Sequence, residues 1–231
     1  MSAHFTFDKN EAIATITFNR PEKRNPLNDE VILEFEALIN QVRDDREVRV
    51  LIVTGKGSVF SAGADLSATR GITDPAERAR ISRETAGRFP RLIGRAFEAI
   101  THLDAITIGA INGPAIGGGW SIALAFDFCL VADGAEFWVP EVDMGVPYRG
   151  APAQLMAARM GPWRAREAIL ECRHYRADEL LAMGLINRIV KREELMDEAQ
   201  ALAERLARKP VAAVQGSKRD INAFFFGQRL F

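Results

Sequence analysis

Hydrophobic residues recur with two different periods along the chain, one typical of strands and the other typical of helices. In residues 29–45, apolar side chains return every three to four positions, acidic residues occupy the first turn and Asn28 precedes it as an N-cap, so this segment predicts a helix. Runs rich in β-branched residues predict strands instead. They lie at residues 12–18, 48–54, 105–111 and 128–133.

The order of these segments predicts the fold class. Residues 74–103 have a helical period that is broken near Pro90, and the last third of the chain is mostly helical, with a long amphipathic stretch over residues 193–208. Strands that alternate with helices predict an α/β fold with βαβ connections. We expect a core over residues 1–190 and a short helical region over residues 191–231 that caps the core or contacts another subunit.

Composition and charge argue against two classes of partner. Of 231 residues, 48% are hydrophobic and 26% are charged, which is ordinary for a globular protein with one substantial core. The formal net charge is −1 and the isoelectric point lies near 6.3. A chain with this net charge lacks the excess of Lys and Arg that binds nucleic acid or an anionic membrane, so we expect neither partner.

The sequence does not favour a metal site, a disulfide framework or a targeting peptide. The chain has two cysteines, Cys129 and Cys172, and its three histidines show no metal-ligand spacing, so we expect no disulfide framework and no metal. The first residues lack the pattern of a targeting peptide, which favours the cytoplasm. The uncharged run over residues 105–126 contains Pro114 and five glycines, so we interpret it as a strand, a turn and a buried helix rather than a membrane span.

The most informative stretch is NGPAIGGGWSIALAFD, residues 112–127, in which three glycines separate a strand from a helix. The glycines permit a tight turn in which side chains would clash, or an anion cradle, or an oxyanion hole. A dinucleotide cradle fits poorly because the glycines are adjacent rather than spaced as GxGxxG. An oxyanion hole needs a second backbone donor, and FSAGADL, residues 60–66, is the other loop in which small residues follow a strand.

Four motifs in order carry a family resemblance: FSAGADL, then AINGPAIGGGWSIALAFDFCLVAD, then EFWVPEVDMGVP, then RADELLAMGLINRIV. Together with the early segment NRPEKRNPLN, they resemble the enoyl-CoA hydratase/isomerase, or crotonase, superfamily from about residue 12 to residue 222. The resemblance implies an α/β spiral core of ββα units, an acyl-CoA substrate and assembly as a homotrimer or hexamer. It implies no cofactor, because coenzyme A enters as part of the thioester.

The resemblance also implies roles for individual residues. The backbone N–H groups of Ala64 and Gly118 would hold the thioester oxygen as an oxyanion hole, with helix 118–126 pointing its positive end at the developing charge. The substrate pocket would involve Gly117, Trp120, Ser121, Tyr148 and Arg149. Coenzyme A would contact Lys23, Arg24, Ala62, Asp65, Leu66 and Lys218, although the basic members of this set are also typical of solvated surface positions.

The reaction depends on two positions. Hydratases of the family use two glutamates; here the second is present as Glu141, whereas Ser121 stands at the first, and a serine hydroxyl is no base near neutral pH. We therefore expect a double-bond isomerase with Glu141 as a single proton shuttle, its pKa raised by the apolar residues Phe137, Trp138, Val139, Val142 and Met144. The alternatives are a weak hydratase with water held by Ser121, a decarboxylase or hydrolase, and a non-catalytic acyl-CoA-binding protein.

Tyr148 and Arg149 replace small residues of the family pattern. One hypothesis is that they narrow the acyl pocket or bind a polar acyl group; the alternative is that Arg149 faces solvent.

Overall fold

The computed structural model describes residues 4–67, 71–74, 76–77, 80–81 and 89–226. It confirms the α/β class and a mostly parallel sheet. The larger sheet has six strands in the order β1-β2-β3-β4-β6-β9, and every pair in it is parallel except β1 with β2. Its strands are β1 (Phe5–Asn10), β2 (Ile13–Phe18), β3 (Val50–Gly55), β4 (Ile106–Ile111), β6 (Phe128–Ala132) and β9 (Arg188–Val190).

A second sheet of three short strands has the order β5-β7-β8. It consists of β5 (Ala115–Ile116), β7 (Glu136–Trp138) and β8 (Tyr175–Arg176). The helices are α1 (Asp29–Asp44), α3 (Phe89–Thr101), α4 (Gly118–Ala125), α5 (Ala151–Met160), α6 (Pro162–Leu170), α7 (Ala177–Ala182), α8 (Leu195–Ala207) and α9 (Val211–Phe226), with 3-10 turns at η1 (Pro21–Lys23) and η3 (Arg192–Glu194).

The structure contains a strand, β1, that the sequence pattern did not predict, and it confirms the predicted helix α1. Residues 5–10 are short and mostly exposed beyond Phe5, and they pair with β2 through a turn in which Glu11 has a positive φ of 51°. α1 begins as expected, because the Asn28 side chain accepts a hydrogen bond from the Val31 N–H at 2.9 Å.

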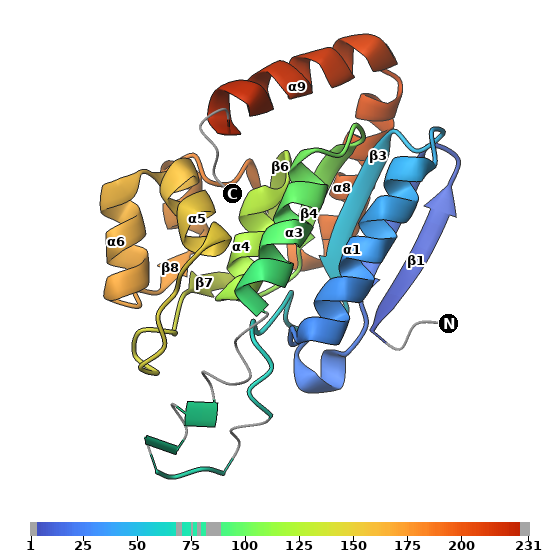
Figure 1. Ribbon diagram of the computed structural model, residues 1–231. Coiled ribbons are helices and arrows are strands. Elements are labelled where there is room, and N and C mark those ends of the chain that lie inside the picture. Colours follow the sequence, from blue (N-terminus) through green and yellow to red (C-terminus); the bar gives the residue numbers. More distant parts are fainter. Residues whose placement is uncertain (1–3, 68–70, 75, 78–79, 82–88, 227–231) are drawn as a thin grey trace.

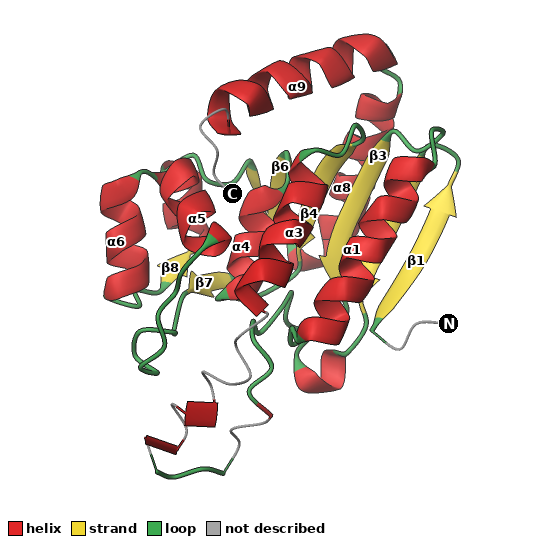
Figure 2. Ribbon diagram, in the orientation of Figure 1, coloured by secondary structure: helices red, strands yellow, loops and turns green. Residues whose placement is uncertain are grey.

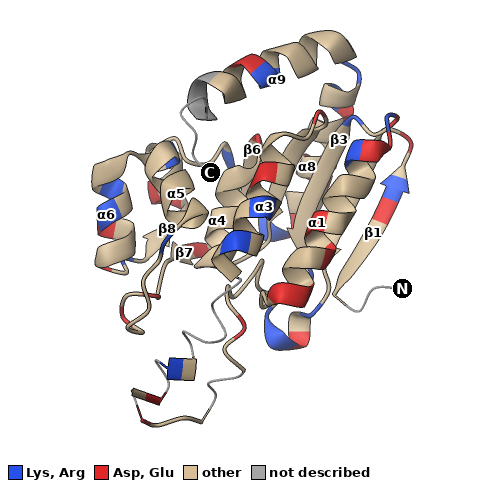
Figure 3. Ribbon diagram, in the orientation of Figure 1, with Lys and Arg blue, Asp and Glu red and all other residues tan. Residues whose placement is uncertain are grey.

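Helices cover both faces of the larger sheet. In Figures 1 and 2, α1 and α3 lie in front of the strands, and α8 lies behind them. β3 is buried along its whole length: Leu51 and Val53 belong to the core beneath α1 and α3, whereas Val50 and Ile52 pack toward α8. Burial on both faces explains why β3 reads as a continuous hydrophobic run. In Figure 3, the positions of charged residues are coloured on the outer helices, and β3 and α4 contain no charged residue.

The C-terminal region divides into two parts. α8 supplies Leu195, Ala199, Leu202 and Ala203 to one hydrophobic cluster with the strands, so it belongs to the core rather than to a separate cap. α9 follows Pro210 and crosses the ends of the strands (Figure 1). Within the described residues, no helix combines the length and apolar character that a membrane span requires.

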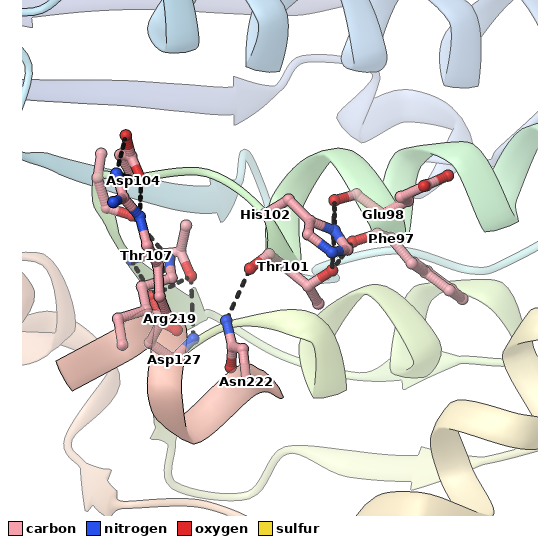
Figure 4. A network of polar contacts seen from close by, with 11 residues as sticks. Phe97, Glu98, Thr101, His102, Asp104, Thr107, Asp127, Arg219 and Asn222 are labelled. Atoms are coloured by element: carbon pink, nitrogen blue, oxygen red, sulfur yellow. Dashed lines mark hydrogen bonds and ion pairs between the residues drawn. The ribbon is translucent and has the colours of Figure 1, made fainter. Parts of the chain in front are cut away.

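Polar contacts attach α9 to the amino ends of β4 and β6 (Figure 4). Lys218 Nζ lies 2.6 Å from Asp127 Oδ2 and donates to the Ala105 carbonyl at 2.8 Å. Asp127 also accepts hydrogen bonds from the Thr107 N–H and hydroxyl. Arg219 pairs with Asp104 in an exposed contact, so the neighbouring pairs differ mainly in burial.

An aromatic cluster joins the N-terminal hairpin to α1 and to the loop after β3. Phe18 lies against Phe5, Phe35 and Phe60, with ring centroids 4.9, 5.4 and 5.5 Å away. All four side chains are at most 2% exposed. Phe60 is the first residue of the FSAGADL loop that the sequence singled out, so the cluster supports the start of that loop.

Phe35 is the residue that α1 contributes to the aromatic cluster, so replacing it should destabilise the fold. We expect Phe35→Ala to lower the free energy of unfolding by about 3–5 kcal/mol, because it leaves a cavity in the cluster. Leu33→Ala is the control, since Leu33 lies on the same helix and is 45% exposed. Urea denaturation of both variants measures the difference; equal losses contradict the assignment of the cluster as core.

Candidate active site

The two loops that the sequence paired meet where β3 and β4 end. These strands are adjacent and parallel, so their following loops leave the same edge of the sheet. Ser61 forms a parallel bridge with Ala115, and the Ile116 N–H donates to the Ser61 carbonyl at 3.0 Å. The Phe60 N–H donates to the Pro114 carbonyl at 3.1 Å. The expected juxtaposition of the loops is thus present.

A third segment orients Ala64. Leu27 donates its N–H to the Gly63 carbonyl at 2.7 Å, and the Asp65 N–H donates to the Leu27 carbonyl at 2.8 Å. In a parallel bridge of this kind, the flanking residues make both bonds, so the N–H of the central residue points to the opposite side. No acceptor for the Ala64 N–H occurs among the described residues. Asn25, which sequence analysis did not single out, holds this segment by donating to the Val59 carbonyl at 2.8 Å.

Each of the three adjacent glycines occupies a position where a side chain would clash. Gly117 has φ of 49° and ψ of −116°, and its N–H donates to the Trp138 carbonyl at 2.8 Å. A Cβ at Gly118 would lie 2.9 Å from Ile93 Cδ1, and one at Gly119 would lie 2.8 Å from the Ser61 carbonyl oxygen. The interpretation as a tight turn is therefore correct, and it is compatible with an oxyanion hole.

The Gly118 N–H opens α4 and, as a first-turn donor, has no partner within the helix. A Cβ on Gly63 would lie 3.5 Å from the Gly118 nitrogen and 2.6 Å from the Ile116 carbonyl oxygen. The absence of side chains at Gly63 and Gly117 thus lets the two loops approach closely beside the Gly118 nitrogen.

Glu141 lies against the same turn. β7 pairs in parallel with β5, with Trp138 opposite Ile116, and this register brings the residues after β7 beside Gly117. A Cβ at Gly117 would overlap Glu141 Oε1 and lie 3.2 Å from its Cδ. Glu141 Oε2 is buried and has no hydrogen-bond partner among the described residues. Burial raises the pKa of Glu141 to about 7, in the direction expected from the sequence.

The residues around Glu141 are only partly those expected. Phe137 and Val139 are buried, with 1% and 0% exposure, and belong to the main core. Val142 and Met144 are 36% and 38% exposed, so they are wrongly assigned to the apolar surroundings that raise this pKa. The nearby Asp143 is exposed.

Ser121 and Tyr148 lie together over the carbonyl of Gly117. Their hydroxyl groups are hydrogen-bonded to each other, and the Ser121 and Tyr148 oxygens lie 3.3 and 3.4 Å from the Gly117 carbonyl oxygen. Ser121 is fully buried, and burial raises the pKa of Tyr148 far above its usual range. The position that carries a carboxylate in the family pattern is therefore occupied by two neutral hydroxyl groups.

Comparison with known proteins identifies the family. A family model described as enoyl-CoA hydratase/isomerase matches residues 8–229. This chain belongs to the enoyl-CoA hydratase/isomerase family. It is therefore an enzyme that has the crotonase fold and acts on acyl-CoA thioesters.

Individual relatives agree with the family model. The chain is 33% identical to a crotonyl-CoA hydratase from Syntrophomonas wolfei over 216 residues, which cover 93% of this chain and 80% of that protein. It is 36% identical to a carnitinyl-CoA dehydratase from Shigella flexneri over 221 residues, covering 94% and 80%. The crystal structure of an enoyl-CoA hydratase from Mycobacterium avium subsp. paratuberculosis superposes with a TM-score of 0.84 at 29% identity, covering 99% of this chain and 88% of that one.

Trp120 and Arg149 were both expected to line the substrate pocket, but one is in the core and the other is exposed. Trp120 is 1% exposed and packs against the rings of Phe137 and Tyr175, so it is a core residue rather than a pocket wall. The reason is the helical period, which turns residue 120 toward the second sheet while residue 121 faces Tyr148. Arg149 is exposed, which agrees with the solvent-facing alternative.

Most residues expected to contact coenzyme A lie on one pair of loops. The Ala62 N–H donates to the Arg24 carbonyl at 2.9 Å, which joins the early loop to the FSAGADL loop. Lys23 and Arg24 are exposed, and Leu66 is 49% exposed. Asp65 Oδ2 lies 3.8 Å from Arg20 Nη1, a buried atom that makes no hydrogen bond within the described part of the chain. Sequence analysis did not single out Arg20. Their contacts with coenzyme A stay predictions.

Lys218 does not lie with this set. It is 6% exposed and paired with Asp127 at the amino ends of β4 and β6, whereas the loops follow the carboxyl ends of β3 and β4. An ammonium group that is buried against a carboxylate is not free to bind a phosphate. The structure therefore contradicts Lys218 as a coenzyme A contact of its own chain and assigns it to the attachment of α9.

Substitution of Lys218 separates these two roles. We expect Lys218→Met to lower the free energy of unfolding by about 3 kcal/mol, because it leaves Asp127 with a poorly compensated buried charge. The KM for acyl-CoA should stay unchanged. Arg219→Met, which breaks an exposed pair, should cost at most about 1 kcal/mol. A raised KM at unchanged stability would restore Lys218 as a substrate contact.

The raised pKa of Glu141 makes stability depend on pH. Between about pH 4.5, the ordinary value, and about 7, the folded protein retains a proton that the unfolded chain has released. Stability therefore falls as pH rises through this range, by about 3 kcal/mol once pH exceeds 7. We expect Glu141→Gln to remove this loss, so that the variant gains stability over the parent at pH 8 but not at pH 5. Urea unfolding at both pH values measures it, and a gain that is equal at both contradicts the assignment.

Proposed function

We propose that the enzyme is an enoyl-CoA double-bond isomerase in which Glu141 moves a proton between C2 and C4 of a 3-enoyl-CoA. The observation that carries the proposal is the asymmetry of the site. Glu141 Oε2, a buried carboxylate oxygen without a hydrogen-bond partner among the described residues, belongs to a carboxylate that lies against Gly117, whereas the neutral Ser121 and Tyr148 hydroxyls lie at the Gly117 carbonyl. Of these groups, only Glu141 titrates near neutral pH.

The backbone donors supply the electrostatic part of the reaction. In the proposed complex, the N–H groups of Ala64 and Gly118 donate to the thioester oxygen, and α4 adds the positive end of its dipole. Negative charge on that oxygen grows as the C2 proton leaves, so these donors stabilise the transition state more than the ground state. Losing one such donor typically costs about 3–4 kcal/mol of activation free energy.

Glu141 supplies the proton transfer. Its carboxylate takes a proton from C2, and the electrons of that C–H bond spread over the dienolate from the thioester oxygen to C4. The same carboxyl group then returns the proton at C4, which shifts the double bond from C3–C4 to C2–C3 without consuming water. A pKa of about 7 suits a group that must accept and release a proton in one turnover.

A second candidate is hydration, or its reverse, of a 2-enoyl-CoA. The names of the crotonyl-CoA hydratase and carnitinyl-CoA dehydratase relatives favour it. In that reaction Glu141 would take a proton from water and deliver one to C2, because neither Ser121 nor Tyr148 is a base at neutral pH. The two candidates share the oxyanion hole and Glu141, and they differ in whether water is consumed.

Separate assays with 3-enoyl-CoA and 2-enoyl-CoA distinguish the candidates. We expect ultraviolet absorbance of the conjugated thioester to appear from the 3-enoyl substrate. Glu141→Gln should lower that rate by about 10²- to 10⁴-fold, as is usual when a positioned base is removed. Asp143→Asn is the matched control, since it neutralises an exposed carboxylate two residues away and should leave the rate unchanged.

Loss of conjugation from the 2-enoyl substrate, without its appearance from the 3-enoyl substrate, would overturn the isomerase proposal in favour of hydration. No change in absorbance with either substrate would favour a protein that binds acyl-CoA or performs a different reaction on the thioester.

A further inference from the structure

The peptide unit between Gly117 and Gly118 has two ends with different partners. Its N–H belongs to Gly118 and is one of the proposed oxyanion donors, while its carbonyl belongs to Gly117. The inference below rests on that proposed role of the N–H but not on which reaction follows. Because a peptide is planar, whatever fixes its carbonyl also fixes the direction of its N–H.

One backbone N–H and two hydroxyl groups lie within hydrogen-bond distance of the Gly117 carbonyl oxygen, and one of the two hydroxyls donates to it at a time. The Ser121 N–H donates at 3.1 Å, which is the ordinary first bond of a helix. The Ser121 hydroxyl oxygen lies 3.3 Å away and the Tyr148 hydroxyl oxygen 3.4 Å away. A carbonyl oxygen that accepts from side chains as well as from its own helix is held more firmly than helix geometry requires.

A count of protons limits what the two hydroxyls can do. Each hydroxyl has one proton to donate. One proton joins the hydroxyls to each other, and the other goes to Gly117 O, whichever of the two hydroxyls donates it. No hydroxyl proton is left for Glu141 or for a substrate, which agrees with the unpartnered Oε2 of Glu141.

We propose that Ser121 and Tyr148 form a positioning pair that orients and polarises the Gly117–Gly118 peptide as an oxyanion donor. Hydrogen bonds to a carbonyl draw electron density away from the peptide nitrogen, so the N–H at the other end becomes a stronger donor. The bond from the Gly117 N–H to the Trp138 carbonyl holds the preceding peptide from the opposite direction. At position 121, where the family pattern has a glutamate, the Ser121 hydroxyl thus strengthens the Gly118 N–H as a donor and transfers no proton.

The charged surroundings support a positioning role over a direct one. Burial and the nearby Glu141 charge both raise the pKa of Tyr148, and the hydroxyl of Ser121 does not ionise near neutral pH. Tyr148 is therefore neutral throughout the working range of Glu141. Arg149, the next residue, is exposed and lies outside this group of contacts.

Single and double substitutions test the pair. In Tyr148→Phe the Ser121 hydroxyl still donates to Gly117 O, and in Ser121→Ala the Tyr148 hydroxyl takes its place. We expect each single variant to lower kcat by only about 2- to 3-fold. The double variant loses every side-chain donor, so its kcat should fall by about 10-fold or more, which exceeds the product of the singles but stays below the about 10²-fold loss of a whole donor.

Tyr175→Phe is the matched control. The chain has two tyrosines, and Tyr175 is the other one; it is fully buried and its hydroxyl donates to Glu167 at 3.0 Å, away from Gly117. We expect it to lose stability without a change in kcat. KM should stay within about two-fold in every variant, because the pair acts on the transition state.

Infrared spectroscopy of bound butyryl-CoA, labelled with carbon-13 at the thioester carbonyl, gives a readout that a merely structural role would not move. This saturated thioester has no double bond to shift or hydrate. We expect the parent enzyme to lower the carbonyl frequency, and the double variant to return the band toward its position in free butyryl-CoA. The control variant should leave the band in the parent position.

The outcomes separate this inference from the proposed function. An unchanged band in the double variant, or a raised KM with unchanged kcat, overturns the positioning pair. A loss in Tyr148→Phe as large as that in Glu141→Gln overturns it as well, because Tyr148 would then move the proton itself. A band that responds as expected in an enzyme without isomerase activity supports the pair while the isomerase proposal fails.

Discussion

The site depends on an approach of backbone to backbone that leaves no room for side chains. The loops after β3 and β4 are joined by the bridge between Ser61 and Ala115. A Cβ at Gly63 or Gly119 would overlap the backbone of the opposite loop, and one at Gly117 would overlap the Glu141 carboxylate. Because the backbones come this close, Gly63 lies beside the Gly118 nitrogen and the Glu141 carboxylate lies beside Gly117. Larger residues at these positions would separate the loops and remove the geometry on which the proposed chemistry rests.

The stability of the core and the chemistry of the site are linked at two points. Phe60 belongs to the aromatic cluster and comes directly before Ser61, so packing beneath α1 fixes the start of the FSAGADL loop. Glu141 acts in the opposite direction, because burial of its carboxylate lowers stability at neutral pH. A carboxyl group that was stabilised by an ion pair would keep a low pKa and would serve poorly as a proton carrier.

Several elements of the fold were predictable because their signals are local. The four β-branched runs became β2, β3, β4 and β6, and α1 begins at the Asn28 cap. β1 was missed because only one side of a short edge strand packs on the core, and its period is weak. The unusual residue at position 121 was visible in the sequence, yet its contact with Tyr148 was not, because 27 residues separate the two and packing alone brings them together.

The sequence by itself determined the order of the elements, the two glycine-bearing loops, the family motifs, and the presence of Glu141 opposite a serine. Only the tertiary structure decided which groups those residues meet. It placed Trp120 in the core, paired Lys218 with Asp127 at the far edge of the sheet, and set two hydroxyls on the Gly117 carbonyl. The reason is that propensity and period act within a few residues, whereas burial and hydrogen-bond partners depend on segments that meet only after the sheet and its helices have packed.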